Sequence, residues 1–284
     1  MTTSTPQPQQ QQPPPQPGAL PGAMYTSPIP VRPAHLGHAL ASEWTKIRSV
    51  RSTLWTLGVF VALVVGIGLL VAWKSAGSDF SDVPYTVPAL IGLLLGQVCL
   101  TTLGVLVVTS EYGTGMIRTT FTAAPQRHRV LAAKFLVFFA LAYVVSVVSI
   151  TVVGLATAAM NVVPEGSGQD WGTTALTGAL YVSLLGVLGL AVGSMLRHSA
   201  GAITVMLGLV LVPAIMPAFL MMSDSLRGVG EVMLAYNAPN ALSALFGLPM
   251  YDSASHGVPQ LLALLGLTVV AMGGAFALLE KRDV

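Results

Sequence analysis

Residues 171–196, WGTTALTGALYVSLLGVLGLAVGSML, contain no Asp, Glu, Lys or Arg and could cross a bilayer as one helix. A helix rises about 1.5 Å per residue, and the hydrocarbon core of a bilayer is about 30 Å thick. Charge-free stretches of similar length also occur at 52–73, 83–110, 135–164, 198–223 and 253–279. The pattern predicts an all-α membrane protein with six transmembrane helices, at about 52–73, 88–110, 132–158, 173–196, 200–222 and 260–279.

The composition excludes an ordinary soluble domain. Of the 284 residues, 54% are hydrophobic and 8% are charged, whereas about a quarter of the residues in soluble domains are charged. The net charge of +2 does not indicate a nucleic-acid partner, because the cations lie at the ends of the predicted spans, where they meet lipid headgroups. We expect a multi-pass protein of the plasma membrane.

The distribution of cations predicts the orientation of the spans. If both termini are cytoplasmic, eleven of the 13 Lys and Arg residues lie on the cytoplasmic side. Only Lys74 and Arg227 then lie outside. Lys and Arg next to a span are retained in the cytoplasm, so we expect cytoplasmic N- and C-termini.

Two different segments precede the six-helix transmembrane domain, 52–284. Residues 1–35 are rich in Pro and Gln, which predicts a disordered cytoplasmic tail. Over 36–51, apolar residues recur every three or four positions, which predicts an amphipathic interfacial helix. The alternative is the frayed start of the first span. We expect Trp44 at headgroup depth and, on the opposite face, Glu43 with the phosphate-facing cations Lys46, Arg48 and Arg51.

The polar residues in the interior of the predicted spans are uncharged. Gln97, Thr101 and Thr102 could line a translocation pathway, or they could form hydrogen bonds that hold the bundle together. Ser183 and Ser194 have no base nearby in the sequence, so we expect them to bond to their own helix backbone. Two GxxxG patterns, Gly92 to Gly96 and Gly189 to Gly193, favour close packing of helices within the chain over a dimer seam.

The segment between the fifth and sixth spans, 223–259, is apolar but too interrupted to cross the membrane. Asn237, Pro239 and Asn240 break it. We expect one or two short helices that dip into the outer leaflet, which requires protein to cover their free backbone groups. The alternative is a water-exposed loop with a small helix.

No catalytic or metal-binding pattern is present in the sequence. The histidines fall in tails or loops, HExxH is missing, and the charge-free spans exclude carboxylates at membrane depth. The phosphate-binding pattern GxxxxGK[ST] is also missing. We therefore expect no catalytic residue, no metal and no cofactor in this chain.

Four short stretches, in this order around the spans, resemble one transporter family. They are EWTKIRSVRST from Glu43, EYGTGMIRTT from Glu111, PQRHR followed by Lys134, and the terminal KRDV. With six spans, this order is similar to the permease subunit of ABC-2-type exporters. The resemblance covers about residues 36–284.

The resemblance implies that the cytoplasmic segment 111–129 is a coupling element that rests on a separate ATP-binding subunit. The residues that match the family pattern are Glu111, Gly113, Arg118, Pro125, Arg127 and Arg129. ATP and Mg²⁺ are then expected on that partner, and a second copy or a related permease completes the pathway. The other interpretation of the charges is that they only anchor the spans to headgroups.

A different class of function fits the same spans. A membrane subunit that anchors or senses for a signalling or lipid-modifying complex needs no intramembrane ion site either. An adjacent gene for an ATP-binding subunit would favour the exporter. For an exporter, the absence of charge within the spans favours an apolar or amphiphilic substrate.

Overall fold

The computed structural model describes residues 35–78, 80, 83–123, 126–161, 171–249 and 257–281. Within these residues the regular structure is entirely helical, and six helical segments are long and apolar enough to cross a membrane. The all-α fold with six such helices is therefore confirmed. The side of the membrane on which the termini lie stays a prediction, and the predicted tail lies outside the described residues apart from His35.

The six long segments have the following bounds. The first combines α2 (Arg51–Val61), a π-helical turn, η1 (Ala62–Ile67), and α3 (Gly68–Lys74). The others are α4 (Pro88–Gly113), α6 (Arg127–Met160), α7 (Trp171–Leu196), α8 (Ser199–Ile215) followed by α9 (Pro217–Leu220), and α12 (Val258–Lys281). The third segment begins at Arg127, whereas the sequence predicts its span from 132. At 34 residues, α6 is about 51 Å long, so it exceeds the membrane core unless it tilts strongly.

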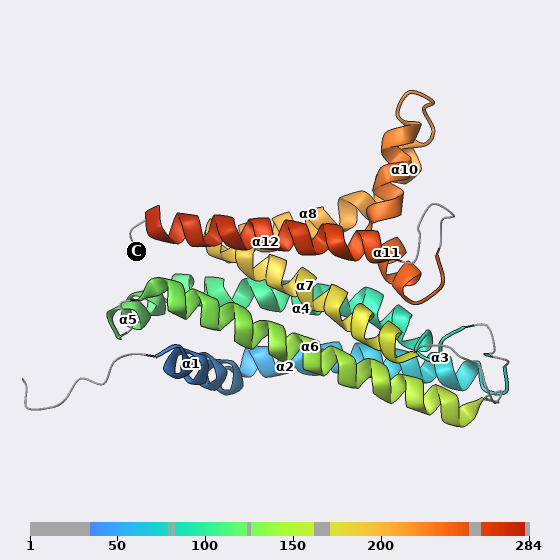
Figure 1. Ribbon diagram of the computed structural model, residues 1–284, viewed down its shortest axis with the longest axis horizontal. Helices are drawn as coiled ribbons and strands as arrows, with labels where there is room; N and C mark the ends of the chain where they lie inside the picture. Colours follow the sequence, from blue (N-terminus) through green and yellow to red (C-terminus); the bar gives the residue numbers. More distant parts are fainter. Residues whose placement is uncertain are drawn as a thin grey trace, which may run out of the picture. The chain divides into compact units, whose positions relative to one another are not determined.

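Helix α7 is the centre of the bundle and packs against α4, α6, α8 and α12 (Figure 1). In its most apolar stretch 78% of the residues are buried, compared with 17% in the first span. Glycines make this close packing possible. A Cβ atom on Gly189 would lie 2.6 Å from the carbonyl oxygen of Thr101 in α4, and one on Gly92 would lie 2.6 Å from Cα of Val64 in η1. Both GxxxG patterns therefore serve packing within the chain, as predicted.

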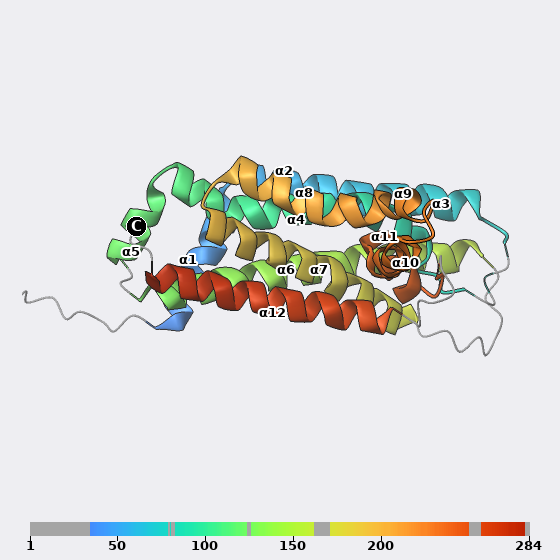
Figure 2. The same ribbon diagram turned by 90° about the horizontal axis from the view of Figure 1, so that it is seen from above.

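Helix α1 (Leu36–Ser49) is separated from the first span by one residue. The backbone of Val50 is extended, with φ −83° and ψ 112°, so the α-helical direction changes there. Figure 2 shows α1 running across the long helices instead of along them. Arg51, which the sequence assigns to the interfacial helix, begins α2.

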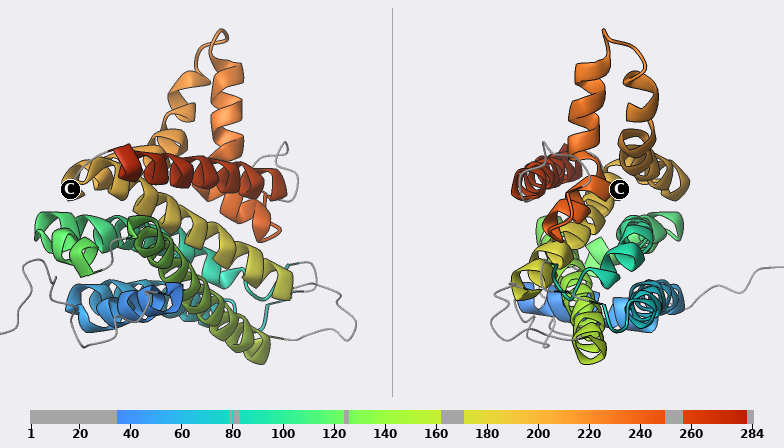
Figure 3. Two further views of the ribbon diagram at one scale, coloured as in Figure 1. Left: turned by 60° about the vertical axis from the view of Figure 1, so that its left-hand side comes forward. Right: turned by 90° about the vertical axis from the view of Figure 1, so that its right-hand side faces the viewer.

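Two short helices follow α9. Helix α10 (Arg227–Tyr236) stands away from the long helices, whereas α11 (Ala238–Leu245) packs against α4, α7, α8 and α12 (Figure 3). Polar side chains bond the backbone at their junction. Asn237 Oδ1 accepts from the backbone N–H of Asn240 at 2.7 Å, and the side-chain amides of Asn240 and Gln260 both donate to the carbonyl of Ala235. Asn237 and Asn240, which interrupt this segment in the sequence, thus bond backbone groups where α10 meets α11.

Candidate functional site

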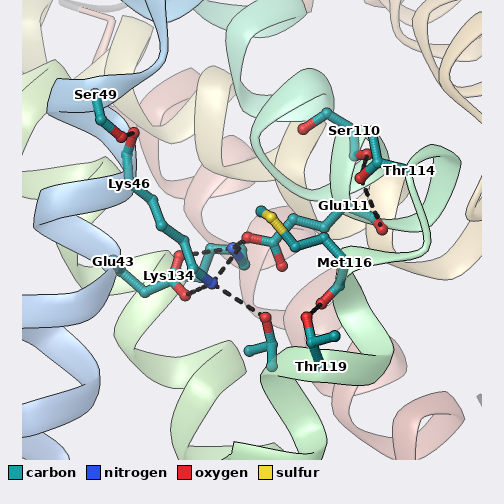
Figure 4. A network of polar contacts seen from close by, with 10 residues as sticks. Glu43, Lys46, Ser49, Ser110, Glu111, Thr114, Met116, Thr119 and Lys134 are labelled. Atoms are coloured by element: carbon teal, nitrogen blue, oxygen red, sulfur yellow. Dashed lines mark hydrogen bonds and ion pairs between the residues drawn. The ribbon is translucent and has the colours of Figure 1, made fainter.

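Four charged side chains form a buried network where α1, α4 and α6 meet (Figure 4). Glu43 and Lys46 come from one face of α1, because residues three apart in a helix are neighbours. Glu111 comes from the last turn of α4, and Lys134 from the first part of α6. Residues that are 91 positions apart in the sequence are thereby bonded directly.

Each carboxylate of the network contacts both ammonium groups. Lys134 Nζ donates to Glu43 Oε2 at 2.6 Å and to Glu111 Oε1 at 2.7 Å. Lys46 Nζ donates to Glu43 Oε1 at 2.7 Å and to the same Glu111 Oε1 at 3.0 Å. Two acids and two bases balance, which is the condition under which charges can be buried together.

Burial distinguishes this network from a surface ion pair. Glu43 and Lys134 are each 2% exposed and Glu111 is 4% exposed, whereas the side chain of Lys46 is 24% exposed. Burial disfavours the charged form of Lys46, but hydrogen bonds and the negative charges of Glu43 and Glu111 outweigh it, so the pKa of Lys46 is raised above its usual value. Lys46 therefore stays charged at neutral pH.

The structure corrects the predicted polar face of α1. Glu43 and Lys46 do not share an outward face with Arg48, because Glu43 is buried and Lys46 turns toward α4 and α6. Trp44 and Arg48 are exposed, as is Arg51 at the start of α2. The apolar side of this helix is largely exposed as well, so α1 has one face for its surroundings and a charged face for the bundle.

The short helix α5 (Met116–Ala123) connects the ends of α4 and α6. Gly115 makes the turn into it with φ +72°, a left-handed conformation that favours glycine. Ile117 is buried and Phe121 packs against the core, whereas Arg118 and Thr122 are exposed. One face of α5 thus packs against the bundle, and the other face is exposed.

Helix α5 is also connected to the charge network. Thr120 Oγ1 lies 3.4 Å from Lys46 Nζ, so the network contacts a fourth helix. The guanidinium group of Arg127 lies over the ring of Phe121, 5.5 Å from its centre. A displacement of α5 therefore meets side chains from α1, α4 and α6 directly.

The predicted residues of segment 111–129 fall in different places. Glu111 is in the buried network, Gly113 ends α4, and Arg118 lies on the exposed face of α5. Arg127 and Arg129 are half-buried in the first turn of α6. Pro125 lies outside the described residues. The sequence therefore groups residues that contact the bundle with a residue that points away from it.

The three candidate pathway residues lie in α4. Gln97 and Thr101 are buried, and both bond to their own helix: Gln97 Nε2 donates to the carbonyl of Leu94, and Thr101 Oγ1 donates to the carbonyl of Gln97. Thr102 is half-buried. Ser183 and Ser194 donate to Ala179 and Ala191 of α7, which confirms the expected bonding to their own helix.

A family model described as ABC-2 family transporter protein matches residues 39–213, more than half of the chain. The chain belongs to this ABC-2 family. No curated protein matches it. As an ABC-2 membrane protein, it is the transmembrane, non-catalytic component of a transporter, is multi-pass, and belongs to a type of permease that works with an ATP-binding subunit.

The match covers all four members of the network, because it begins before Glu43 and ends after Lys134. Sequence reasoning identified Glu111, Lys46 and Lys134 but missed their contact. The one local signal is the negative charge of Glu111 next to a predicted cytoplasmic boundary. An acid there does not help to keep the loop in the cytoplasm, as Lys and Arg do. Nothing in the local sequence separates Glu43 from the other charges of 36–51, and its burial beside Ile47 is seen only in the structure.

Proposed function

We propose that this ABC-2 permease is the pathway-forming subunit of an ATP-driven exporter in the plasma membrane, and that α5 receives the movement of a separate ATP-binding subunit. The observation that carries the proposal is the two-sided construction of α5. One face packs on the bundle through Ile117 and Phe121, and the other presents Arg118. ATP and Mg²⁺ bind on the partner.

The buried network is the means of transmission. Glu111 lies in the last turn of α4, shortly before the turn into α5, and Lys134 bonds it to α6. Lys46 adds α1 and contacts Thr120 of α5. Because packed helices with short charged bonds move as units, a push on α5 tilts the ends of the second and third spans together and carries α1 with them.

Export requires a pathway, which we assign to two copies of this chain or to one copy and a related permease. The orientation follows from the cation distribution, which puts α1, α5 and the α7–α8 turn in the cytoplasm. The scarcity of charge at membrane depth supports an apolar or amphiphilic substrate.

The substitution Arg118→Glu tests the coupling role. Because Arg118 is exposed on α5, reversal of its charge leaves the packing of the bundle unchanged and disturbs only the surface offered to the ATP-binding subunit. We expect loss of most substrate-stimulated ATP hydrolysis and export, with normal amounts of protein in the membrane. The matched control is Arg227→Glu at the start of α10, an exposed arginine at the opposite end of the molecule, which retains both activities.

Co-purification tests the assembly itself. A tagged chain extracted in mild detergent is expected to bring down an ATP-binding subunit, and Arg118→Glu to reduce its recovery. Recovery of no ATPase from membranes that contain one, or equal export by both arginine variants, would contradict the proposal.

A further inference from the structure

A cavity of about 270 Å³ lies beside the charge network, between the α1–α2 junction and α4. Its apolar wall comes from Val50 at the junction and from Leu103, Leu106 and Val107 of α4. Its charged end is made by Lys46, Glu111 and Lys134. Its size is close to the lower limit of about 300 Å³ for pockets that hold small molecules, so it suits a single chain better than a two-chain lipid.

The cavity has an opening toward its surroundings. Val50, Ser52 and Ser110 are all exposed, and each of them also contributes to the lining. These residues lie where the first and second spans end, which is the level of a membrane interface. An amphiphile in the adjacent leaflet can therefore reach the cavity from the side.

One acceptor at the charged end has no partner. Glu111 Oε1 is bonded by both lysines, but Glu111 Oε2 is buried and bonds to no described residue. An unsatisfied buried carboxylate oxygen is unfavourable by several kcal/mol in general, which makes it a strong attractor for a hydrogen-bond donor. Figure 4 shows the side chains of Glu111, Lys46 and Lys134 converging, and Met116 of α5 is another residue that lines the cavity.

The charges around this oxygen select the kind of donor. Lys46 and Lys134 already lie 3.0 and 2.7 Å from Glu111, so a third cation meets two like charges at short range. An anionic group would be repelled by the carboxylates of Glu43 and Glu111. A neutral hydroxyl donates its proton to the free oxygen without either conflict, and the hydroxyl groups of Ser52, Thr53 and Ser110 stand near the same cavity to bond it.

We propose that this cavity is a binding site for a neutral, single-chain amphiphile with a hydroxyl head, which donates to Glu111 Oε2 and places its chain between α2 and α4. The inference goes beyond the proposed function, because it concerns binding to this chain alone and requires neither ATP nor transport.

The test uses the full chain in phosphatidylcholine nanodiscs and a long-chain alcohol that carries a diazirine in its chain. After illumination, mass spectrometry of the peptides locates the label. We expect labelling at residues 50–56 and 103–110, and competition by the unlabelled alcohol. A fatty acid and an alkylamine with the same diazirine chain are expected to label these peptides about tenfold less, the effect of one hydrogen bond.

Substitutions in α4 provide the matched comparison. Leu106→Trp fills the cavity and is expected to abolish labelling of both peptides. Leu95→Trp makes the same change in the same helix at a side chain that is 53% exposed, and is expected to leave the labelling unchanged. The competition experiment on the unsubstituted chain decides the matter even if Leu106→Trp does not fold. Equal labelling by all three probes, or label spread over the exposed faces without competition, would mean that only water and bulk lipid occupy the cavity and would overturn the proposal.

Discussion

At the scale of single residues, the buried charge network of Glu43, Lys46, Glu111 and Lys134 supports both the packing and the proposed coupling. Lys134 has no access to water as an alternative partner, because it is 2% exposed, and it bonds both carboxylates. Lys46 is partly exposed and has water as an alternative partner. The two lysines therefore differ in what their removal does, although they have the same charge and the same two acidic neighbours.

Replacement of Lys134 by Met is expected to destabilise the protein by about 3–5 kcal/mol, because it leaves two buried carboxylates with one ammonium group. The double substitution Lys134→Met with Glu111→Leu restores the balance of charge and is expected to be more stable than Lys134→Met alone. Unfolding in detergent, followed by circular dichroism, measures both. A double variant less stable than the single one would show that the charges are not the cause.

The raised pKa of Lys46 predicts a dependence on alkaline pH. A lysine whose pKa is higher in the folded state contributes stability that is complete below its unfolded pKa of about 10.5 and is lost as pH rises through the folded value. We expect a constant unfolding temperature between about pH 7 and pH 9 and a fall above about pH 10.5. In Lys46→Met the alkaline fall is smaller, because the group with the raised pKa is absent. An equal fall in both proteins would contradict this assignment.

At the scale of elements, close contact between α4 and α7 holds the bundle together. Gly186, Gly189 and Gly193 of α7 lie against backbone oxygens of α4, so this contact has no room for a methyl group. Apolar burial alone does not hold helices together in lipid, because lipid tails are as apolar as leucine. Tight packing takes over that role.

Gly189→Ala is expected to lower the stability by about 1–3 kcal/mol, because its Cβ would lie 2.6 Å from the carbonyl oxygen of Thr101. Gly208→Ala in α8 is the control, since nothing lies within 4 Å of a Cβ atom there. That variant is expected to be as stable as the original protein or slightly more so, because alanine favours helix. Thermal unfolding of the purified variants distinguishes the two positions.

Sequence reasoning predicted the long helices well and the site only in part, and the reason is physical. A span is a local property, because twenty apolar residues suffice to specify it. The partner of Glu43 is Lys134, 91 residues later, and no local pattern contains that pairing. The sequence also assigns the polar face of 36–51 to lipid phosphates, whereas Glu43 and Lys46 of that face contact α4 and α6.

At the scale of the whole molecule, the ends of the long helices have different characters. The end that carries α1, α5 and the α7–α8 turn contains the charge network (Figures 1 and 2). The other end carries α10 and α11, where amide side chains bond the backbone at the junction of the two helices. This asymmetry is what an assembly driven from one side of a membrane requires.

Cysteine labelling tests the orientation of the whole molecule. In a Cys99→Ser background, His128→Cys and His198→Cys are expected to react from the cytoplasmic side of sealed vesicles, and Asp224→Cys from the outer side. All three positions are exposed, so each thiol is accessible. Reaction of positions 128 and 198 from opposite sides would refute the six-span topology.

The wide turn η1 in the first span has a consequence for the distant end of that span. A π-helical turn holds one more residue than an α-helical turn, so Ala62–Ile67 sets the angular phase of everything that precedes it. If these residues wound as a regular α-helix with none of them removed, the preceding segment would be turned by about 100° relative to Gly92. Phe60 would then lose its place against Gly96, and α1, which follows the same span end, would turn with it. The π-helical turn therefore sets the direction in which α1 leaves the first span, and with it the approach of Glu43 to Lys134.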